Sequence, residues 1–96
     1  MKPSLALELN RATIRASAAR FRVANPRIFG SVLHGTDREG SDLDVVVDTL
    51  PGTTFFHLSG LQIELEDLLG VSVDVLTPAG LPLKFHDAVL AEAQPV

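Results

Sequence analysis

The sequence contains no cysteine, and basic residues become scarce beyond residue 27. Without cysteine the chain can form no disulfide framework, no thiolate nucleophile and no cysteine zinc site. No apolar run approaches the roughly 20 residues that a membrane-spanning helix needs, and the first fifteen residues hold no apolar core of a secretory signal. These absences predict a protein of the reducing cytoplasm that has no membrane segment.

Charge is distributed unevenly along a chain whose net charge is −4. Residues 1–27 hold six of the eight basic residues against one acid, and the remainder holds two basic residues against eleven acids. Arg11, Arg15 and Arg22 fall within a narrow arc of a helical wheel, beside Glu8. This arc is either a solvated helix face or a surface that contacts an anion or an acidic partner. Because the chain is acidic overall and its basic residues are not interleaved with aromatic ones, direct nucleic-acid binding is not expected.

The chain is predicted to form a single domain over residues 1–96, since a chain of this length buries one core. Helices are predicted over residues 4–21, 53–69 and 83–93, strands over 27–31, 42–48 and 71–76, and loops over 32–41 and 77–82. Ser4 is the predicted N-cap of the first helix, Asn25-Pro26 ends that segment, and Gly70 ends the second helix. The order α-β-β-α-β-α predicts an α+β fold, a small mixed β-sheet flanked by helices.

Aspartates mark the second and third predicted strands. Because strand side chains alternate, Asp42 and Asp44 share one face, whereas Leu43 and its alternate neighbours point into the core. Asp74 stands in an otherwise apolar strand, where an unpaired charge is costly, and it completes a cluster of three carboxylates if the two strands are neighbours. Such oxygen ligands, with no histidine or cysteine beside them, favour Mg²⁺ or Mn²⁺ over zinc. Asp48, close to the Pro51-Gly52 turn, is interpreted as a turn residue.

The pair Gly30-Ser31 ends the first predicted strand. Glycine lets a ligand approach the backbone, and the serine hydroxyl and the following amides can donate hydrogen bonds to phosphate oxygens. A phosphate cradle beside a divalent-metal site predicts binding of a nucleoside triphosphate, with phosphoryl or nucleotidyl transfer as the reaction. The G-x-x-x-x-G-K-[ST] and G-x-G-x-x-G motifs are absent, and residues 42–48 lack the glycine of an EF-hand loop.

The spacing of these residues resembles a known signature. Gly30-Ser31, then ten residues, then Asp42-x-Asp44 and a later strand carboxylate, Asp74, resemble the DNA polymerase beta-like nucleotidyltransferase superfamily. The order of NPRIFGS, SDLDVVVD and VDVLTP is similar to the minimal nucleotidyltransferase (MNT) branch over nearly the whole chain. The resemblance implies the antitoxin of a HEPN/MNT toxin–antitoxin pair, which inactivates its HEPN ribonuclease by moving AMP from ATP to a tyrosine hydroxyl.

The resemblance also implies roles for individual residues. Gly30 and Ser31 would hold the triphosphate of ATP, and Asp42 and Asp44 would bind two Mg²⁺ ions, with Mn²⁺ as a substitute. Asp74 would bind the metal that activates the acceptor hydroxyl and would help to deprotonate that hydroxyl. His34 stands in the nucleotide-binding loop where many members have arginine. Since histidine is mostly neutral at pH 7 and cannot grip phosphate bidentately, weaker nucleotide binding is expected.

Two other functions remain open. One is an MNT domain with weak chemistry that neutralises a HEPN toxin by steric binding. The other is a nucleotidyltransferase for a small molecule such as an aminoglycoside, although enzymes of that kind usually carry an additional substrate domain. A partner surface is predicted at Leu81, Leu83 and residues 89–91, since a short chain that is 46% hydrophobic leaves apolar surface exposed. His57 and His86 are interpreted as ordinary helix residues.

Overall fold

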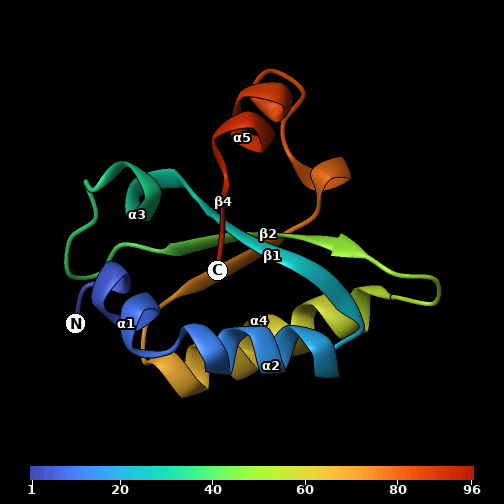
Figure 1. Ribbon diagram of the computed structural model, residues 1–96, viewed down its shortest axis with the longest axis horizontal. Coiled ribbons are helices and arrows are strands. Elements are labelled where there is room, and N and C mark those ends of the chain that lie inside the picture. The colour runs from blue at the N-terminus through green and yellow to red at the C-terminus, as the bar shows by residue number, and fades with distance from the viewer.

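The computed structural model describes all residues, 1–96, and has helices on both faces of one sheet (Figure 1). The helices are α1 (Pro3–Leu9), α2 (Arg11–Arg20), α3 (Gly30–His34), α4 (Phe55–Leu69), the 3₁₀ turn η1 (Pro78–Gly80) and α5 (His86–Glu92). The strands are β1 (Val23–Phe29), β2 (Leu43–Thr49), β3 (Val73–Leu76) and β4 (Gln94–Pro95). No helix has both the length and the apolar character that crossing a membrane requires.

The sheet is mixed, as predicted, and its strand order is β3-β2-β1-β4. Strand β2 runs antiparallel to β1 and parallel to β3, which places Asp44 beside Asp74 in the register. The parallel pair needs a crossover, and α4 supplies it. The predicted α+β class is therefore confirmed, with the two acidic strands side by side at the centre and edge of the sheet.

The first predicted helix, residues 4–21, is wrong as a single element because the chain breaks at Asn10. The Asn10 side chain donates to the Ala6 carbonyl at 2.8 Å, and the Asn10 backbone leaves helical geometry at φ −135°. Asparagine side chains compete with the backbone for hydrogen bonds in this way. Ser4 is also not the N-cap, since Lys2 occupies that position.

Strand β1 begins at Val23, four residues before the predicted start, and passes through Asn25-Pro26. The strand tolerates this pair because the register shifts between Ala24 and Arg27, with Asn25 at φ 54°. A bulge of this kind accommodates a proline that cannot donate to the ladder. The Pro26 carbonyl instead accepts the Val96 amide at 3.0 Å, next to strand β4, which the sequence analysis missed.

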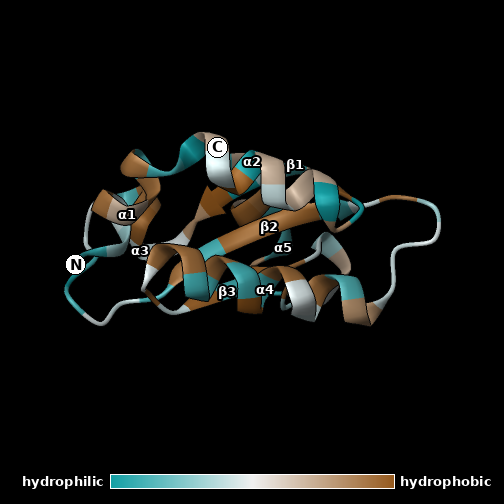
Figure 2. Ribbon diagram, turned by 90° about the horizontal axis from the view of Figure 1, so that it is seen from below, coloured by the Kyte–Doolittle hydropathy of each residue, from teal (hydrophilic) through white to brown (hydrophobic).

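One face of the sheet is covered by α2 and α4, which lie side by side in Figure 2. Thr54 and His57 form a capping box at the start of α4, and Gly70 ends it at φ 71°, as predicted. Glu66 and Gln62 accept the amides of Val73 and Val75, both at 3.1 Å, so α4 also protects the edge strand β3. The core between these layers includes Ile14, Ala18, Val45, Val47, Leu61 and Leu65.

The other face of the sheet carries α3 and α5. Helix α5, shorter than the predicted 83–93, has no buried residue and stands above the sheet in Figure 1. The predicted third strand is also shorter, starting at Val73. Val46, on this face, is fully buried although it lies outside the main core cluster. This face therefore holds little apolar packing and leaves room for polar side chains.

Candidate functional site

The residues after β1 form a short helix, α3, where a loop over 32–41 was predicted. Gly30 begins α3 with φ 75°, and a Cβ atom placed on it would lie 2.2 Å from the Asp44 Oδ2 atom. Any other residue would therefore be strained and would also collide with the carboxylate. The glycine of the Gly-Ser pair thus allows α3 to start directly against the acidic strand.

Asp44 is the half-buried centre of the acidic group. It pairs in the register with Phe29 on one side and with Asp74 on the other. Burial and, after it, the negative charges of Asp74 and Asp42 together raise the pKa of Asp44 to about 6. The structure therefore brings the three predicted carboxylates close enough to repel one another.

Asp74 is exposed, so the high cost expected for an unpaired charge in this otherwise apolar strand does not apply. Strand β3 is the edge of the sheet, so a side chain on its outer face meets water. Solvent lowers the cost of an unpaired carboxylate. A positive charge at this site would instead stabilise the half-buried Asp44, which is destabilised by burial and by its two acidic neighbours.

The chemistry of this group fits a divalent cation. All donors are carboxylate oxygens, which Mg²⁺ and Mn²⁺ prefer, and a bound cation would relieve the repulsion that raises the pKa of Asp44. No three acidic or histidine side chains stand together in a metal-holding arrangement, so the carboxylates do not form a preformed cage. Asp42, Asp44 and Asp74 are the residues that would hold the metal, and their metal and catalytic roles remain predictions.

Ser31 and His34 lie on α3 at different exposures. Ser31 is half-buried, and its carbonyl accepts the Thr36 amide at 2.9 Å, which closes the end of the helix. His34 is exposed, and its Nε2 atom lies 3.0 Å from Glu92 Oε2 on α5. The predicted phosphate side of the site therefore has a side-chain contact to the helix that stands above the sheet.

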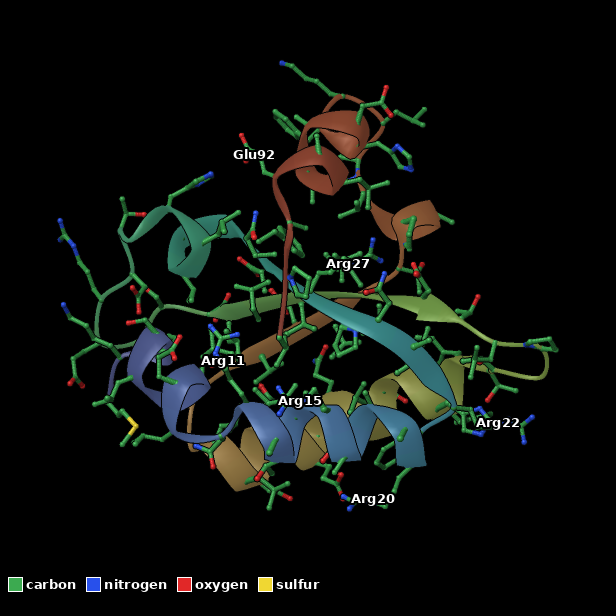
Figure 3. The ribbon with its side chains drawn as sticks, in the orientation of Figure 1. Arg11, Arg15, Arg20, Arg22, Arg27 and Glu92 are labelled. Carbon is green, nitrogen blue, oxygen red and sulfur yellow. The ribbon has the colours of Figure 1, made fainter.

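Arg27 and Asp48 form an ion pair that the sequence analysis missed. The Arg27 guanidinium donates to Asp48 Oδ1 at 2.6 Å, and Asn25 donates to Asp48 Oδ2 at 3.2 Å. Asp48 therefore lies within β2 as a paired strand residue, and its interpretation as a turn residue is wrong. In Figure 3, Arg27 lies between the sheet and α5. Arg27 pairs in the register with Val46 of β2, which shares a face with Asp44. The alternation of β2 could have signalled a partner, since Asp48 shares the Asp44 face.

The remaining arginines of the basic N-terminal region, which Figure 3 labels, lie on α2 and just after it. Each has a partner within the molecule. Arg11 pairs with Glu8 at 2.6 Å, and Arg20 pairs with Glu64. Arg15 donates to the Val96 carbonyl at 3.0 Å, and Arg22 donates to that of Pro51 at 3.2 Å. Arg22 also lies outside the helix, at φ 56°. The three arginines of the predicted arc therefore each contact an acceptor group within this chain.

A model of the nucleotidyltransferase domain family matches residues 12–95. This chain belongs to the nucleotidyltransferase domain family. Several relatives carry the name protein adenylyltransferase. One from Methanocaldococcus jannaschii, named as a putative protein adenylyltransferase, is 38% identical over 74% of this chain and 76% of its own length. Another, protein adenylyltransferase MntA from Thermococcus cleftensis, is 34% identical over 76% of this chain and 74% of its own length.

Solved structures agree with this family. The nucleotidyltransferase superposes on a minimal nucleotidyltransferase with a TM-score of 0.86 at 38% identity, covering 97% of this chain and 95% of the other. A second structure, a toxin–antitoxin with AMP-PNP, gives a TM-score of 0.72 at 22% identity, covering 90% and 71%. The second likeness is one of fold. The resemblance that the Gly-Ser and Asp-x-Asp spacing indicated is thereby confirmed at the level of the family and its minimal branch.

Proposed function

We propose that this nucleotidyltransferase moves AMP from ATP to a tyrosine hydroxyl of a HEPN ribonuclease toxin and so acts as its antitoxin in the cytoplasm. The observation that carries the proposal is the placing of Gly30 directly against Asp44, with Asp42 and Asp74 as acidic neighbours. The turn that we assign to phosphate and the carboxylates that we assign to the cation are thereby adjacent. The names of the two archaeal relatives support a protein as the acceptor.

The reaction requires an acceptor oxygen to attack the α-phosphorus of ATP. A bond forms between that oxygen and phosphorus, the bond from phosphorus to the pyrophosphate oxygen breaks, and the hydroxyl proton leaves. Asp74 is the residue we assign to accept the proton, because it is exposed at the sheet edge where an acceptor can approach. Mg²⁺ held by the three aspartates would neutralise phosphate charge. Gly30 and Ser31 would orient the triphosphate through their backbone and hydroxyl groups.

The acceptor must belong to another molecule, because the chain contains no tyrosine. The fold resembles that of the toxin–antitoxin solved with AMP-PNP, which supports a toxin as the partner and an adenine nucleotide as the ligand. Leu83 is 94% exposed and Phe85 is 53% exposed beside α5, and we assign the partner contact to this segment. Leu81 is removed from the predicted partner surface because it is buried.

A second candidate function is steric neutralisation of the same partner. It is favoured by His34, which stands at an arginine position of the family motif and contacts Glu92. A histidine at this position gives no fixed positive charge for phosphate. In this case the complex would form without AMP transfer.

Intact mass spectrometry of the partner separates the two candidates. The adjacent HEPN protein, if encoded beside this chain, is incubated with the parent and Mg-ATP. The parent should add one or more AMP units to the partner, and Asp42→Asn should add none. Asp67→Asn, which removes an exposed carboxylate from α4, is the matched control and should act like the parent. A partner that is inhibited and co-purified but unmodified would establish the steric function instead.

A further inference from the structure

Asp37 is the one charged residue among the buried residues of this chain, at 7% exposed. It lies in the segment that joins α3 to β2. The two residues before it and the two residues after it are exposed. A carboxylate in such an exposed segment is normally hydrated. Its burial therefore indicates a specific contact that removes it from water.

That contact is with α1. Asp37 Oδ2 accepts the Ser4 backbone amide at 2.9 Å, across 33 residues of sequence. The hydrogen bond from the Ser4 amide holds the pKa of Asp37 below its usual range. Burial opposes this shift, and the positive charge of Lys2 adds a smaller lowering of the pKa. Amides in the first turn of a helix have no partner within the helix, so a carboxylate from elsewhere in the chain can cap them. Asp37 is thus a cap that α1 receives from the segment beside the candidate site.

Helix α1 is itself fixed to the domain. Pro3, Ala6 and Leu7 are buried, and Ala6 and Leu7 belong to the main core cluster. A helix anchored in the core therefore holds the segment 35–42 through Asp37.

The segment held in this way connects the two halves of the candidate site. It begins at Gly35, which ends α3 at φ 71°, and it leads into Asp42. Near its end, Ser41 Oγ accepts the Arg38 amide at 2.8 Å, and the Arg38 carbonyl accepts the Ser41 amide at 3.0 Å. Asp37 thus lies between Gly35, which ends α3, and the hydrogen-bonded turn from Arg38 to Ser41 that leads into Asp42. A shift of Asp37 would move both neighbours.

We propose that Asp37 is a positioning residue, through which α1 keeps Gly30-Ser31 and the aspartates of β2 in register for a divalent cation and a nucleoside triphosphate. This inference rests on the proposed function for its ligand class. The link between α1 and the segment 35–42 rests on the hydrogen bond between Asp37 and Ser4. Asp37 touches no reacting group and acts through the segment that it holds.

Hydrogen exchange of the amides in the segment 35–42, measured without nucleotide, tests directly whether Asp37 links this segment to α1. Asp37→Ala should speed the exchange of these amides by about tenfold, since the segment loses its link to the core. Asp37→Asn retains an acceptor oxygen and should restore most of the protection. Arg38→Ala is the matched control, because it truncates an exposed side chain of the same segment and leaves the contact between Asp37 and Ser4 in place, and it should exchange like the parent. Protection equal to the parent in Asp37→Ala would overturn the inference.

Kinetics with Mg-ATP tests the consequence for the site. Asp37→Ala should raise the KM for ATP severalfold with a smaller change in kcat, because the ligand must then order the segment. If Asp37→Ala does not fold, Ser4→Pro removes the amide donor instead, at a helix position where proline is tolerated. A parent protein that fails to bind Mg-ATP would contradict the proposed function. Hydrogen exchange would still show whether Asp37 holds the segment 35–42 to α1. A parent that binds, with an unchanged KM in the folded variants, would overturn the positioning role.

Discussion

The two faces of the sheet differ in what their side chains do. The face under α2 and α4 is dry, and its residues from β2, such as Val45 and Val47, are fully buried in one apolar cluster. The opposite face carries Asp44 with a raised pKa, the Arg27–Asp48 pair and α5, which buries no residue. Folding free energy therefore comes mainly from one face, while on the other face the burial of Asp44 beside two acidic neighbours opposes folding. Repulsion among neighbouring carboxylates is typical of a site that binds a cation, because the bound cation relieves it.

The largest effect is expected from a cavity in the dry face. Leu65→Ala should lower the free energy of unfolding by about 3–4 kcal/mol, because Leu65 is fully buried between α4 and the sheet. Urea denaturation measures the change. Leu83→Ala, at 94% exposed on the other side, is the control and should change stability little. Similar losses from both variants would contradict the division between the faces.

The next effect concerns the charges of the polar face. Mg-ATP at about 100 times its Kd should stabilise the parent by about 2.7 kcal/mol, since a ligand that binds only the folded state raises its stability. Asp42→Asn combined with Asp44→Asn should lose this shift, because two of the three proposed ligands lose their charge. Thermal denaturation with and without Mg-ATP measures it. A double variant that responds like the parent would place the cation elsewhere.

Gly30 tests how closely the two parts of the site are packed. Gly30→Ala should cost about 2 kcal/mol or more, because the left-handed backbone is strained and the new methyl group meets Asp44 Oδ2. Gly40→Ala is the matched control: its φ is 85° and nothing lies within 4 Å of the new methyl group. Gly40→Ala should cost about 1 kcal/mol by the strain alone. Equal losses would show that contact with Asp44 does not matter.

Asp44 makes the stability of the polar face depend on pH. Because its pKa is raised from 3.8 to about 6 in the folded state, the folded protein binds more protons than the unfolded chain between these values. Stability of the parent therefore falls as pH rises from about 4 to 6 and stays reduced above. Asp44→Asn should be more stable than the parent at pH 7.5 by about 1–2 kcal/mol, discounted for solvent screening. The difference should vanish near pH 4, and urea denaturation at both pH values measures it. A difference that does not depend on pH would contradict the raised pKa.

The smallest effect concerns nucleotide affinity. His34→Arg should tighten ATP binding by about 1 kcal/mol, from one charge-assisted contact to phosphate. Isothermal titration calorimetry measures the change. Ala19→Arg adds the same charge on the exposed side of α2 and should leave the affinity unchanged. No change in His34→Arg would mean that α3 turns this side chain away from the phosphates.

Patterns of local chemistry were sufficient for part of this protein. The alternation of Leu43, Asp44 and Val45 set the two faces of β2, and Gly70 marked the end of α4, because strand geometry and helix caps depend on neighbouring residues. The spacing of Gly30-Ser31 and Asp42-x-Asp44 indicated the family before any fold was known. Each of these signals lies within about fifteen consecutive residues.

Contacts between distant segments decided the rest. The passage of β1 through Pro26, the strand β4, the Arg27–Asp48 pair and the capping of α1 by Asp37 all depend on residues that are far apart in the sequence. The break at Asn10 is local by contrast, because its side chain bonds the carbonyl of Ala6, four residues earlier. The exposure of Asp74 followed from the place of β3 at the sheet edge, which strand order alone determines. No local pattern carries such information, because a hydrogen bond or an ion pair between distant residues depends on which surfaces the packed core brings together.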